Sequence, residues 1–370
     1  MRLLALTLSI ICLQVSAQNK HHLLIGTYTN KTSNGIYVYE FNSTDGSFQE
    51  RSNIKSANPS FLAVSPNEKF VYAVNEDGNG QGSVSAYGFD KASGKLQFLN
   101  KQSSKGDHPC YVATDKTGQW VAVGNYSGGS FSIFKVLPNG SIDTAAYTVH
   151  HKGSGPDTTR QRSPHVHATF FTPDNDFLLV PDLGIDKIMV YRFDEKTGKP
   201  WVMYQPGISP GGAGPRHIDI HPTAPFVYAV EELSGHIHAF RRTQDGGLKS
   251  VQRISALPPA YKGSIGGADV HISNDGKFLY ASNRGQSNTI AIFRIDEKNG
   301  MLTLLSHQDT KGIKPRNFTI DPSGKFLLVA NQESDEIVIF RRDQKTGMLT
   351  DTDQRIPVSS PVCLKWTKMR

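Results

Sequence analysis

Apolar and polar residues alternate with a period of two in short runs along most of this chain, and turn-forming residues separate the runs. Residues 58–99 show one complete unit, in which NPSFLAVSPNEKFVYAVNE is followed by a loop and then by SVSAYGFDKASGKLQFL. Period-two alternation predicts strands, and the clustered Pro, Asn, Asp and Gly residues between the runs predict turns. The unit therefore predicts four short antiparallel strands.

Aromatic residues mark the same two positions of this unit again and again. The third-strand aromatic stands at Tyr39, Tyr87, Phe134, Tyr191, Phe240, Phe293 and Phe340, with intervals of 47 to 57 residues. The second-strand aromatic stands at Phe70, Trp120, Phe177, Phe226, Phe278 and Phe326. Residues 360–366 supply the missing first strand of the seventh unit, and residues 23–51 supply its other three strands.

Seven four-stranded units, one of them split between the two ends of the chain, predict an all-β fold. The architecture that fits is a closed seven-bladed β-propeller with four-stranded antiparallel blades. Closure removes the free sheet edges of an open array, whereas a solenoid needs capping repeats that this sequence lacks. We expect residues 18–370 to form one such domain.

The first seventeen residues have the pattern of a secretory signal. Arg2 gives a positive start, residues 3–15 are an apolar run, and Val15-Ser16-Ala17 matches a small-residue cleavage site. The run is too short to cross a hydrocarbon layer about 30 Å thick. We expect cleavage after Ala17, export to the periplasm of a bacterial source, and no membrane insertion of the mature chain. The alternative is a short anchor that stays uncleaved.

Composition narrows the remaining options. Three cysteines in 370 residues are too few for a disulfide-built scaffold. Cys110 and Cys363, which remain after cleavage, either pair or stay as separate buried thiols. The formal net charge of +7 suits an anionic small-molecule substrate, and no Lys/Arg run interleaved with aromatics supports nucleic-acid binding. The oligomeric state is left open.

The repeat also predicts which residues meet at the mouth of the central channel, because first strands start and second strands end on the same face. Ten residues before each second-strand aromatic, the chain has Ser60, Cys110, His167, Arg216, Ala268 and Arg316, with Val362 in the split blade. Six residues after it, the chain has Glu76, Tyr126, Leu183, Glu232, Arg284 and Gln332. Polar positions in only some blades are candidate ligand contacts.

Three arginines, two glutamates and one histidine occur in these two rings, and buried charges are costly unless they are paired or used. We expect His167, Arg216, Glu232 and Arg284 to be catalytic. His165, Arg316, Glu76, Tyr126 and Gln332 are the expected substrate-binding residues. Arginine suits bidentate recognition of carboxylate or phosphate. The alternative is that these charges form salt bridges between blades. We also expect two long loops, residues 150–165 and 258–263, to overhang this face of the propeller.

The H-x-H pair of His165 and His167 raises the alternative of a metal site. A third ligand could come from His217, Asp269 or His271, which lie in predicted first strands. We expect neither metal nor cofactor, since arginines at the same mouth oppose a divalent cation. A G-x-S-x-G nucleophile elbow is absent, and Ser154 in a flexible GSG tripeptide is a weak nucleophile candidate.

Several segments resemble the lactonase family of seven-bladed β-propellers. They are SPHVHATFFTPDNDFLLVPDLGIDKIMVYRF, GAGPRHIDIHP, VYAVEEL, GGADVHISNDGKFLYASNR and KPRNFTIDPSGKFLLVANQ, and the resemblance covers roughly residues 24–366. The family includes a bacterial 6-phosphogluconolactonase type and fungal carboxymuconate-cyclising enzymes. Its proposed active site of one His, two Arg and one Glu carries over onto His167, Arg216, Arg284 and Glu232. The phosphogluconolactonase type is usually cytoplasmic, so the export signal is a departure.

The resemblance implies hydrolysis of a sugar lactone. Arg216 and Arg284 would hold an anionic group or polarise the lactone carbonyl, and either Glu232 or His167 would activate water as general base. Two other functions stay open at this point. One is a muconate-type lactonising cycloisomerase, and the other is a non-catalytic propeller that binds a small anion, a glycan or a protein.

Overall fold

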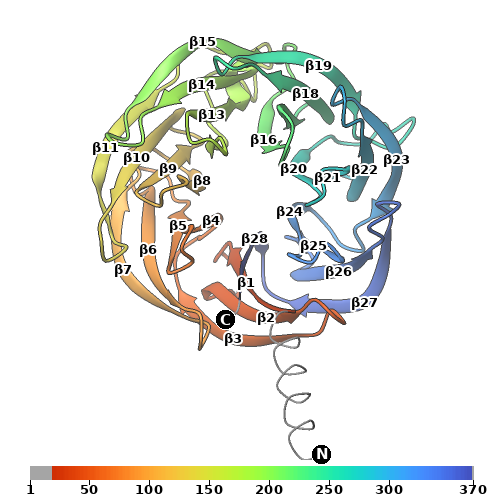
Figure 1. The fold of residues 1–370 in the computed structure, drawn as a ribbon, viewed down its shortest axis with the longest axis horizontal. Coiled ribbons are helices and arrows are strands. Elements are labelled where there is room, and N and C mark those ends of the chain that lie inside the picture. The colour runs from red at the N-terminus through yellow and green to blue at the C-terminus, as the bar shows by residue number, and fades with distance from the viewer. Residues whose placement is uncertain (1–18, 369–370) are drawn as a thin grey trace, which may run out of the picture.

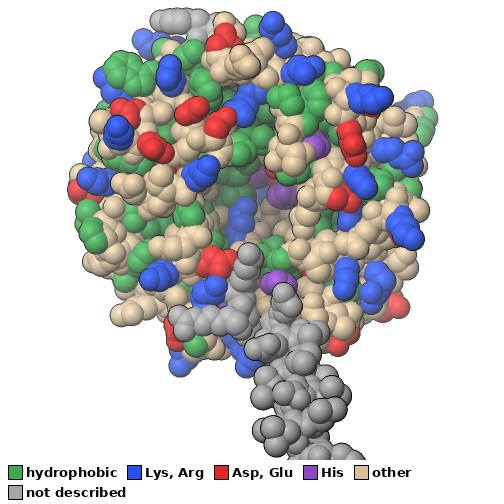
Figure 2. All heavy atoms as spheres, in the orientation of Figure 1, with side chains coloured by type: hydrophobic (Ala, Val, Ile, Leu, Met, Phe, Trp, Pro, Cys, Tyr) green, Lys and Arg blue, Asp and Glu red, His purple; other side chains and the backbone are tan. Residues whose placement is uncertain are grey.

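The computed structural model describes residues 19–368, which form seven four-stranded antiparallel sheets arranged as blades around a central channel (Figure 1). The predicted fold class is therefore confirmed. The face drawn in Figure 2 is hollowed at its centre, where basic and histidine side chains are visible. The predicted signal peptide lies outside the described residues. Within those residues, no helix is long and apolar enough to cross a membrane.

The strands of each blade follow in order from the channel outward. The first four blades are β28 (Pro361–Lys368), β1 (Lys20–Thr27), β2 (Gly35–Asn42) and β3 (Phe48–Lys55); β4 (Leu62–Val64), β5 (Phe70–Asn75), β6 (Ser83–Asp90) and β7 (Lys95–Ser103); β8 (Pro109–Thr114), β9 (Trp120–Asn125), β10 (Ser130–Val136) and β11 (Ile142–His150); β12 (Phe170–Phe171), β13 (Phe177–Asp182), β14 (Lys187–Phe193) and β15 (Pro200–Ile208). The last three are β16 (Pro215–Ile220), β17 (Phe226–Glu231), β18 (His236–Arg242) and β19 (Leu248–Ser255); β20 (Gly267–Ile272), β21 (Phe278–Asn283), β22 (Thr289–Ile295) and β23 (Leu302–Asp309); β24 (Pro315–Ile320), β25 (Phe326–Asn331), β26 (Glu336–Arg342) and β27 (Leu349–Pro357).

The ring closes where β28 pairs with β1, as the split repeat predicts. Leu23 lies opposite Trp366 and Ile25 opposite Leu364 in an antiparallel ladder. The first strand of this blade therefore comes from the C-terminal end of the chain and the other three from the N-terminal end. Cys363 in β28 is a buried free thiol, and so is Cys110, so the two cysteines stay separate.

The second-strand aromatics recur because each one packs under a turn glycine of the next blade along the chain. Gly300, in the β22–β23 turn, has φ +75° and leaves no room for a side chain, since a Cβ there would lie 2.4 Å from the ring of Phe226. L residues rarely adopt this backbone conformation. The same contact joins Gly94 to His22, which stands in β1 where other blades have the aromatic. The repeat thus encodes blade-to-blade packing.

A bulge recurs near the start of four innermost strands, β8, β16, β24 and β28, and leaves one residue of each out of the ladder. In β16, the pairing shifts between Pro215 and His217, so Arg216 has no partner in the ladder. The same shift isolates Cys110 in β8 and Arg316 in β24. Bulges re-aim side chains and are frequent next to functional sites. Here the three bulged residues are all first-ring positions.

Candidate functional site

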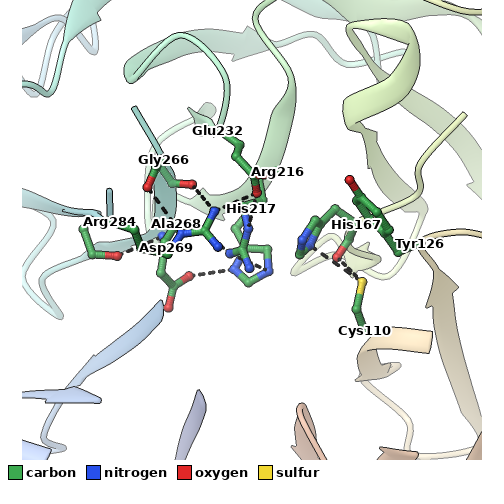
Figure 3. A network of polar contacts seen from close by, with 12 residues as sticks. Cys110, Tyr126, His167, Arg216, His217, Glu232, Gly266, Ala268, Asp269 and Arg284 are labelled. Carbon is green, nitrogen blue, oxygen red and sulfur yellow. Dashed lines mark hydrogen bonds and ion pairs between the residues drawn. The ribbon is translucent and has the colours of Figure 1, made fainter. Parts of the chain in front are cut away.

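A cavity of about 350 Å³ lies where the two predicted rings of residues meet. It is lined by Tyr28, Glu76, Cys110, Tyr126, Arg160, His167, Glu232, Arg284 and Arg316. Figure 3 shows His167, Cys110 and Tyr126 on one side of this region, with Arg216, Glu232 and Arg284 on the other. Most of the lining is polar and three of the residues are arginines, so the cavity suits an anionic or strongly hydrogen-bonding ligand.

Glu232 directly follows β17 and stands among three arginines. Its Oε2 accepts from Arg216 Nε at 3.0 Å and pairs with Arg284 Nη2 at 2.8 Å, while Oε1 accepts from Arg160 Nη2 at 2.5 Å. Burial alone raises the pKa of Glu232, but the charges of Arg284, Arg216 and Arg160 outweigh it and hold the pKa well below its usual range. The carboxylate is therefore ionised and a very weak base.

Arg216 is fully buried behind Glu232 and does not border the cavity. Besides Glu232, its guanidinium donates from Nη1 to Ala268 O and to His217 Nε2, the latter at 3.3 Å. Burial, followed by the repulsion of Arg284 and Arg316, lowers the pKa of Arg216 to about 9. The guanidinium is thus still charged at neutral pH, and its contacts make it a support for Glu232.

His217 accepts a hydrogen bond from Arg216 and links it to a buried carboxylate. Its Nδ1 lies 2.8 Å from Asp269 Oδ1, which places the proton on Nδ1 and leaves Nε2 as an acceptor for Arg216. Burial, followed by the charge of Arg216, lowers the pKa of His217 to about 3, so the ring is neutral. Asp269 is also held by Asn317 Nδ2 and by His271 Nε2 at 3.1 Å. This buried polar network orients Arg216 from below.

His167 is the buried titratable group that faces the cavity without an acidic partner. Its Nδ1 lies 3.7 Å from Cys110 Sγ, its ring packs edge-on against Tyr126, and among residues 19–368 nothing hydrogen-bonds to Nε2. Burial, followed by the charges of Arg216 and Arg316, lowers the pKa of His167 well below its ordinary value. The imidazole is therefore neutral at physiological pH and is able to accept a proton.

Arg316 is the cation of the cavity that has no carboxylate bound to it. Its guanidinium lies over the ring of Tyr28 at 5.4 Å, and in the described part of the chain no hydrogen bond or ion pair holds it. Tyr28 instead donates to Glu76 Oε2 at 2.9 Å. Burial opposes the charge, but Tyr28 and Glu76 hold the pKa of Arg316 above its ordinary value. A half-buried, charged and unpaired guanidinium is suited to an anionic ligand.

The structure brings together most of the residues expected from the sequence. The expected residues that border the cavity are Glu76, Tyr126, His167, Glu232, Arg284 and Arg316. Arg216 stands one layer behind them. His165 stacks on Tyr126 at 4.5 Å between ring centroids, and neither His165 nor Gln332 is among the residues that line the cavity. Those two sites of substrate contact remain predictions.

Sequence reasoning missed Tyr28 and Arg160 as site residues and named Cys110 only as a ring position. Tyr28 follows β1 just as Glu76 follows β5, so it is the second-ring residue of the closing blade. The count from an aromatic failed there because His22 replaces that aromatic. Counting six residues on from His22 reaches Tyr28. Arg160 lies in an insertion that has no counterpart in other blades.

Residues 151–169, between β11 and β12, contain most of the expected loop 150–165 and cover the cavity, because Arg160 reaches Glu232 from them. The neighbouring Gln161 is fully buried and fixes the loop: its Nε2 donates to Asp186 Oδ1 at 2.7 Å and to Leu183 O at 2.8 Å. Asp186 also accepts from the backbone N–H groups of Gly212 and Gly214. The second loop, 258–263, does not line the cavity.

The possible metal site of the H-x-H pair can be examined directly. In the part of the chain that the structure describes, no three His, Cys, Asp or Glu side chains come together as metal ligands. His165 Nδ1 lies 3.1 Å from the carbonyl oxygen of Tyr126, whereas the ring of His167 packs against that of His217. Hydrogen-bonding and ring contacts therefore account for both histidines.

The fold and this His–Arg–Glu cavity define a class of protein that the comparisons identify. A family model described as "Lactonase, 7-bladed beta-propeller" matches residues 22–366, and the chain belongs to this family. It is 36% identical to 6-phosphogluconolactonase of Bacillus subtilis, over 92% of this chain and 97% of that protein.

Two solved structures give the same relationship in three dimensions. A candidate 6-phosphogluconolactonase from Bacteroides fragilis is 41% identical with a TM-score of 0.90, covering 95% of this chain and 99% of that one. A periplasmic gluconolactonase from Pseudomonas aeruginosa is 34% identical, also with a TM-score of 0.90, covering 95% and 100%. The family resemblance stated from the sequence is confirmed.

Proposed function

We propose that this protein is a lactonase that opens the ring ester of a sugar lactone in the cavity between His167 and the arginines. The observation that carries the proposal is the neutral His167, buried without an acidic partner beside the unpaired guanidinium of Arg316. This pairs a proton acceptor with a site for the negative charge that ester hydrolysis creates. Relatives named 6-phosphogluconolactonase support the same reaction class.

The geometry favours His167 over Glu232 as general base. Both carboxylate oxygens of Glu232 are bound by arginines, whereas His167 borders the cavity and its Nε2 has no hydrogen-bond partner among residues 19–368. His167 Nε2 accepts a proton from a water molecule as that water attacks the lactone carbonyl. The carbonyl oxygen gains the negative charge, the C–O bond to the ring oxygen then breaks, and the imidazolium returns the proton to that oxygen. The product is a hydroxy acid.

The arginines supply the electrostatic part of the reaction. Arg316 and Arg284 border the cavity and can face the developing oxyanion and later the product carboxylate. Donors already fixed where charge develops stabilise a transition state without reorganisation. Glu232 and the backbone of Gly267 hold Arg284 in place, since Arg284 Nη2 contacts Glu232 Oε2 and donates to Gly267 O at 3.1 Å.

Acid release from a panel of lactones, followed at constant pH, tests the proposal. We expect turnover of 6-phosphogluconolactone, simple aldonolactones or both, and a large loss of rate in His167→Asn and Glu232→Ala. Absence of turnover with every lactone would overturn the proposal. Muconate-type cyclisation and pure ligand binding are not favoured by the relatives. The first would consume ultraviolet absorbance of a diene diacid, which gives a separate assay.

We further propose that the protein is exported and acts in the periplasm as the mature chain from Gln18. The charged start, apolar run and Val15-Ser16-Ala17 site support this, as does the likeness to a periplasmic gluconolactonase. N-terminal sequencing of protein recovered from the periplasmic fraction tests it. A chain that retains Met1 there would contradict cleavage.

A further inference from the structure

A sulfur atom lies against one ring nitrogen of His167, the histidine that borders the cavity (Figure 3). Cys110 Sγ is 3.7 Å from His167 Nδ1, close enough for a hydrogen bond that involves sulfur. The two side chains come from neighbouring blades, since Cys110 lies in β8 and His167 precedes β12. The other ring nitrogen, Nε2, has no hydrogen-bond partner among residues 19–368. The sulfur contact therefore bears on which nitrogen carries the proton.

The thiol hydrogen of Cys110 has a better acceptor than the imidazole. Cys110 Sγ lies 3.4 Å from the carbonyl oxygen of His167 and 3.8 Å from that of Val166. A carbonyl oxygen can only accept, so the single S–H points to the oxygen of His167. Burial raises the pKa of Cys110, which keeps this hydrogen on the sulfur at neutral pH. The sulfur lone pairs are left to accept a hydrogen bond from Nδ1.

A sulfur acceptor at Nδ1 fixes the tautomer of the ring. A neutral imidazole carries one proton, and the hydrogen bond that one nitrogen makes determines where that proton lies. With the proton on Nδ1, Nε2 is an unprotonated acceptor, the form that a general base requires. With the proton on Nε2, the sulfur of Cys110 and Nδ1 would face each other as two acceptors. The contact thus favours the tautomer that can take a proton from water.

Carboxylates hold the same ring nitrogen of three other histidines whose side chains are buried. The distances from Nδ1 to the carboxylate oxygen are 2.7 Å for His151 and Asp182, 2.8 Å for His217 and Asp269, and 3.4 Å for His238 and Glu231. None of these three histidines borders the cavity. A carboxylate favours the protonated ring, whereas a neutral thiol adds no charge. The thiol can therefore orient His167 without stabilising its imidazolium.

The charged groups around this pair do not replace the thiol as a partner. Four of them act on Cys110, namely Glu76, Arg216, Arg316 and Glu232. In the part of the chain that the structure describes, none of the four hydrogen-bonds to the imidazole of His167. Tyr126 and His217 contact that ring edge-on. Within residues 19–368, the sulfur is thus the side-chain atom that orients the imidazole.

We propose that Cys110 is a positioning residue that holds the proton of His167 on Nδ1 and so keeps Nε2 as the base. This inference rests on the proposed function, because it assigns a partner to His167 within that reaction. The Nδ1–H bond stays directed at the sulfur while Nε2 takes a proton from water and returns it to the ring oxygen of the lactone. Cys110 forms no covalent bond and leaves the cycle unchanged.

Nuclear magnetic resonance of the mature chain, labelled with ¹⁵N in its histidines, tests the tautomer directly. At neutral pH we expect the ring of His167 to show a protonated Nδ1 and an unprotonated Nε2. His167→Asn identifies the two signals by their loss. A ring that carries its proton on Nε2 would overturn the inference.

The repeat itself supplies side chains for variants at position 110. Ser60, Ala268 and Val362 occupy the equivalent first-ring position in other blades. Cys110→Val removes the acceptor and keeps an apolar side chain of similar size. We expect the proton to move to Nε2, which can meet water, because a buried Nδ1–H without a partner is costly. The kcat for a lactone should fall about tenfold, with KM little changed.

Cys110→Ser restores a group that accepts hydrogen bonds and should recover part of the wild-type tautomer and rate. A wild-type tautomer in Cys110→Val would overturn the positioning role, because the sulfur would then not be what holds the proton.

Cys363→Val is the matched control. Cys363 is also a buried free thiol, but its Sγ accepts from the backbone N–H of Leu62 at 3.3 Å and does not line the cavity. This variant should keep the wild-type tautomer of His167 and the wild-type kcat. An equal fall of kcat in Cys363→Val and Cys110→Val would attribute the loss to packing and overturn the positioning role.

The inference and the proposed function fail in different ways. Turnover of lactones by a wild type whose His167 carries its proton on Nε2 would overturn the inference and leave the lactonase intact. Absence of turnover with every lactone would overturn the proposed function. In that case the ¹⁵N signals of wild type and Cys110→Val still decide whether the thiol sets the tautomer of His167.

Discussion

Arg216 and Glu232 form a buried ion pair between adjacent strands of one blade, with Nε 3.0 Å from Oε2, and neither residue acts alone. Arg216 is held from below by His217 and Ala268 O, and Glu232 in turn holds Arg160 and Arg284 at the cavity wall. The pair therefore fixes the positions of Arg160 and Arg284, which border the cavity. The role of this ion pair is to orient neighbouring side chains, since buried ion pairs add little net stability to the fold.

The first prediction concerns this support. Arg216→Lys keeps the charge but cannot reach Glu232, Ala268 O and His217 at once, so we expect kcat/KM for a lactone to fall roughly 100-fold. Initial rates of acid release measure the effect. Arg342→Lys is the matched control, because Arg342 is also a buried arginine but donates to Tyr280 and Gly324 O outside the cavity. Equal rates in both variants would contradict the positional role.

The second prediction concerns the pH dependence of the reaction. The pKa of His167 is lowered by burial and by the charges of Arg216 and Arg316, and the base works only when neutral. Activity should therefore persist as pH falls through 6.5, the ordinary value, and be lost only below it. Arg316→Gln removes a positive charge, raises the pKa of His167 and should move this acid limb to higher pH.

Profiles of kcat/KM against pH, from about pH 4 to about pH 8, measure the limb for the wild type and the variant. Arg162→Gln removes an exposed arginine from the covering loop and should leave the limb in place. A wild-type limb at or above pH 6.5 that Arg316→Gln does not move would rule out His167 as the base.

The third prediction concerns the cysteines. Cys110 and Cys363 are buried and free, and burial raises the pKa of both thiols, so little thiolate forms at neutral pH. The folded mature chain should show no rapidly reacting thiol toward an aromatic disulfide reagent, and two after unfolding in guanidinium. Rapid native labelling of Cys110 would mean that the cavity wall opens.

The fourth prediction concerns the covering loop. Gln161→Ala removes the amide that binds Asp186 and Leu183 O, so the loop 151–169 should become mobile and Arg160 less often in place. We expect KM to rise several-fold and the free energy of unfolding to fall by about 1–3 kcal/mol, the cost of an unsatisfied buried group.

Limited proteolysis should then cut within this loop in Gln161→Ala and not in the wild type. Thr159→Ala, an exposed change in the same loop, is the control, because Thr159 contacts only Asp157 through its side chain. Unaltered proteolysis and KM in Gln161→Ala would show that other contacts fix the loop.

The fold could be predicted from the sequence because each blade repeats the same contact. A turn glycine must pack on a second-strand aromatic, as Gly300 does on Phe226, so the markers recur at nearly constant spacing. Constant spacing also identified Glu232, Arg284 and Arg316 by counting alone. The count missed Tyr28 in the closing blade, because His22 stands there in place of the second-strand aromatic.

The sequence could not predict which ring residues are buried behind others, or where a residue of the covering loop lies relative to the cavity. Arg216 and Arg316 occupy equivalent bulges, yet one lies buried behind Glu232 and the other faces the cavity. That difference depends on the neighbouring blade, where Ala268 O and His217 receive Arg216. Arg160 comes from an insertion without a repeat, so no count could place it beside Glu232.

The pairing of β28 with β1 has a consequence for how the protein is made. The innermost strand of the closing blade, β28, follows all the other strands in residues 19–368, and its Leu364 N–H donates to Asn317, which also binds Asp269 next to the site. Six blades can assemble as the chain emerges, but the ring stays open until β28 arrives. Formation of the site is thus coupled to the presence of β28, and we expect a chain truncated before β28 to be inactive even if its other blades are formed.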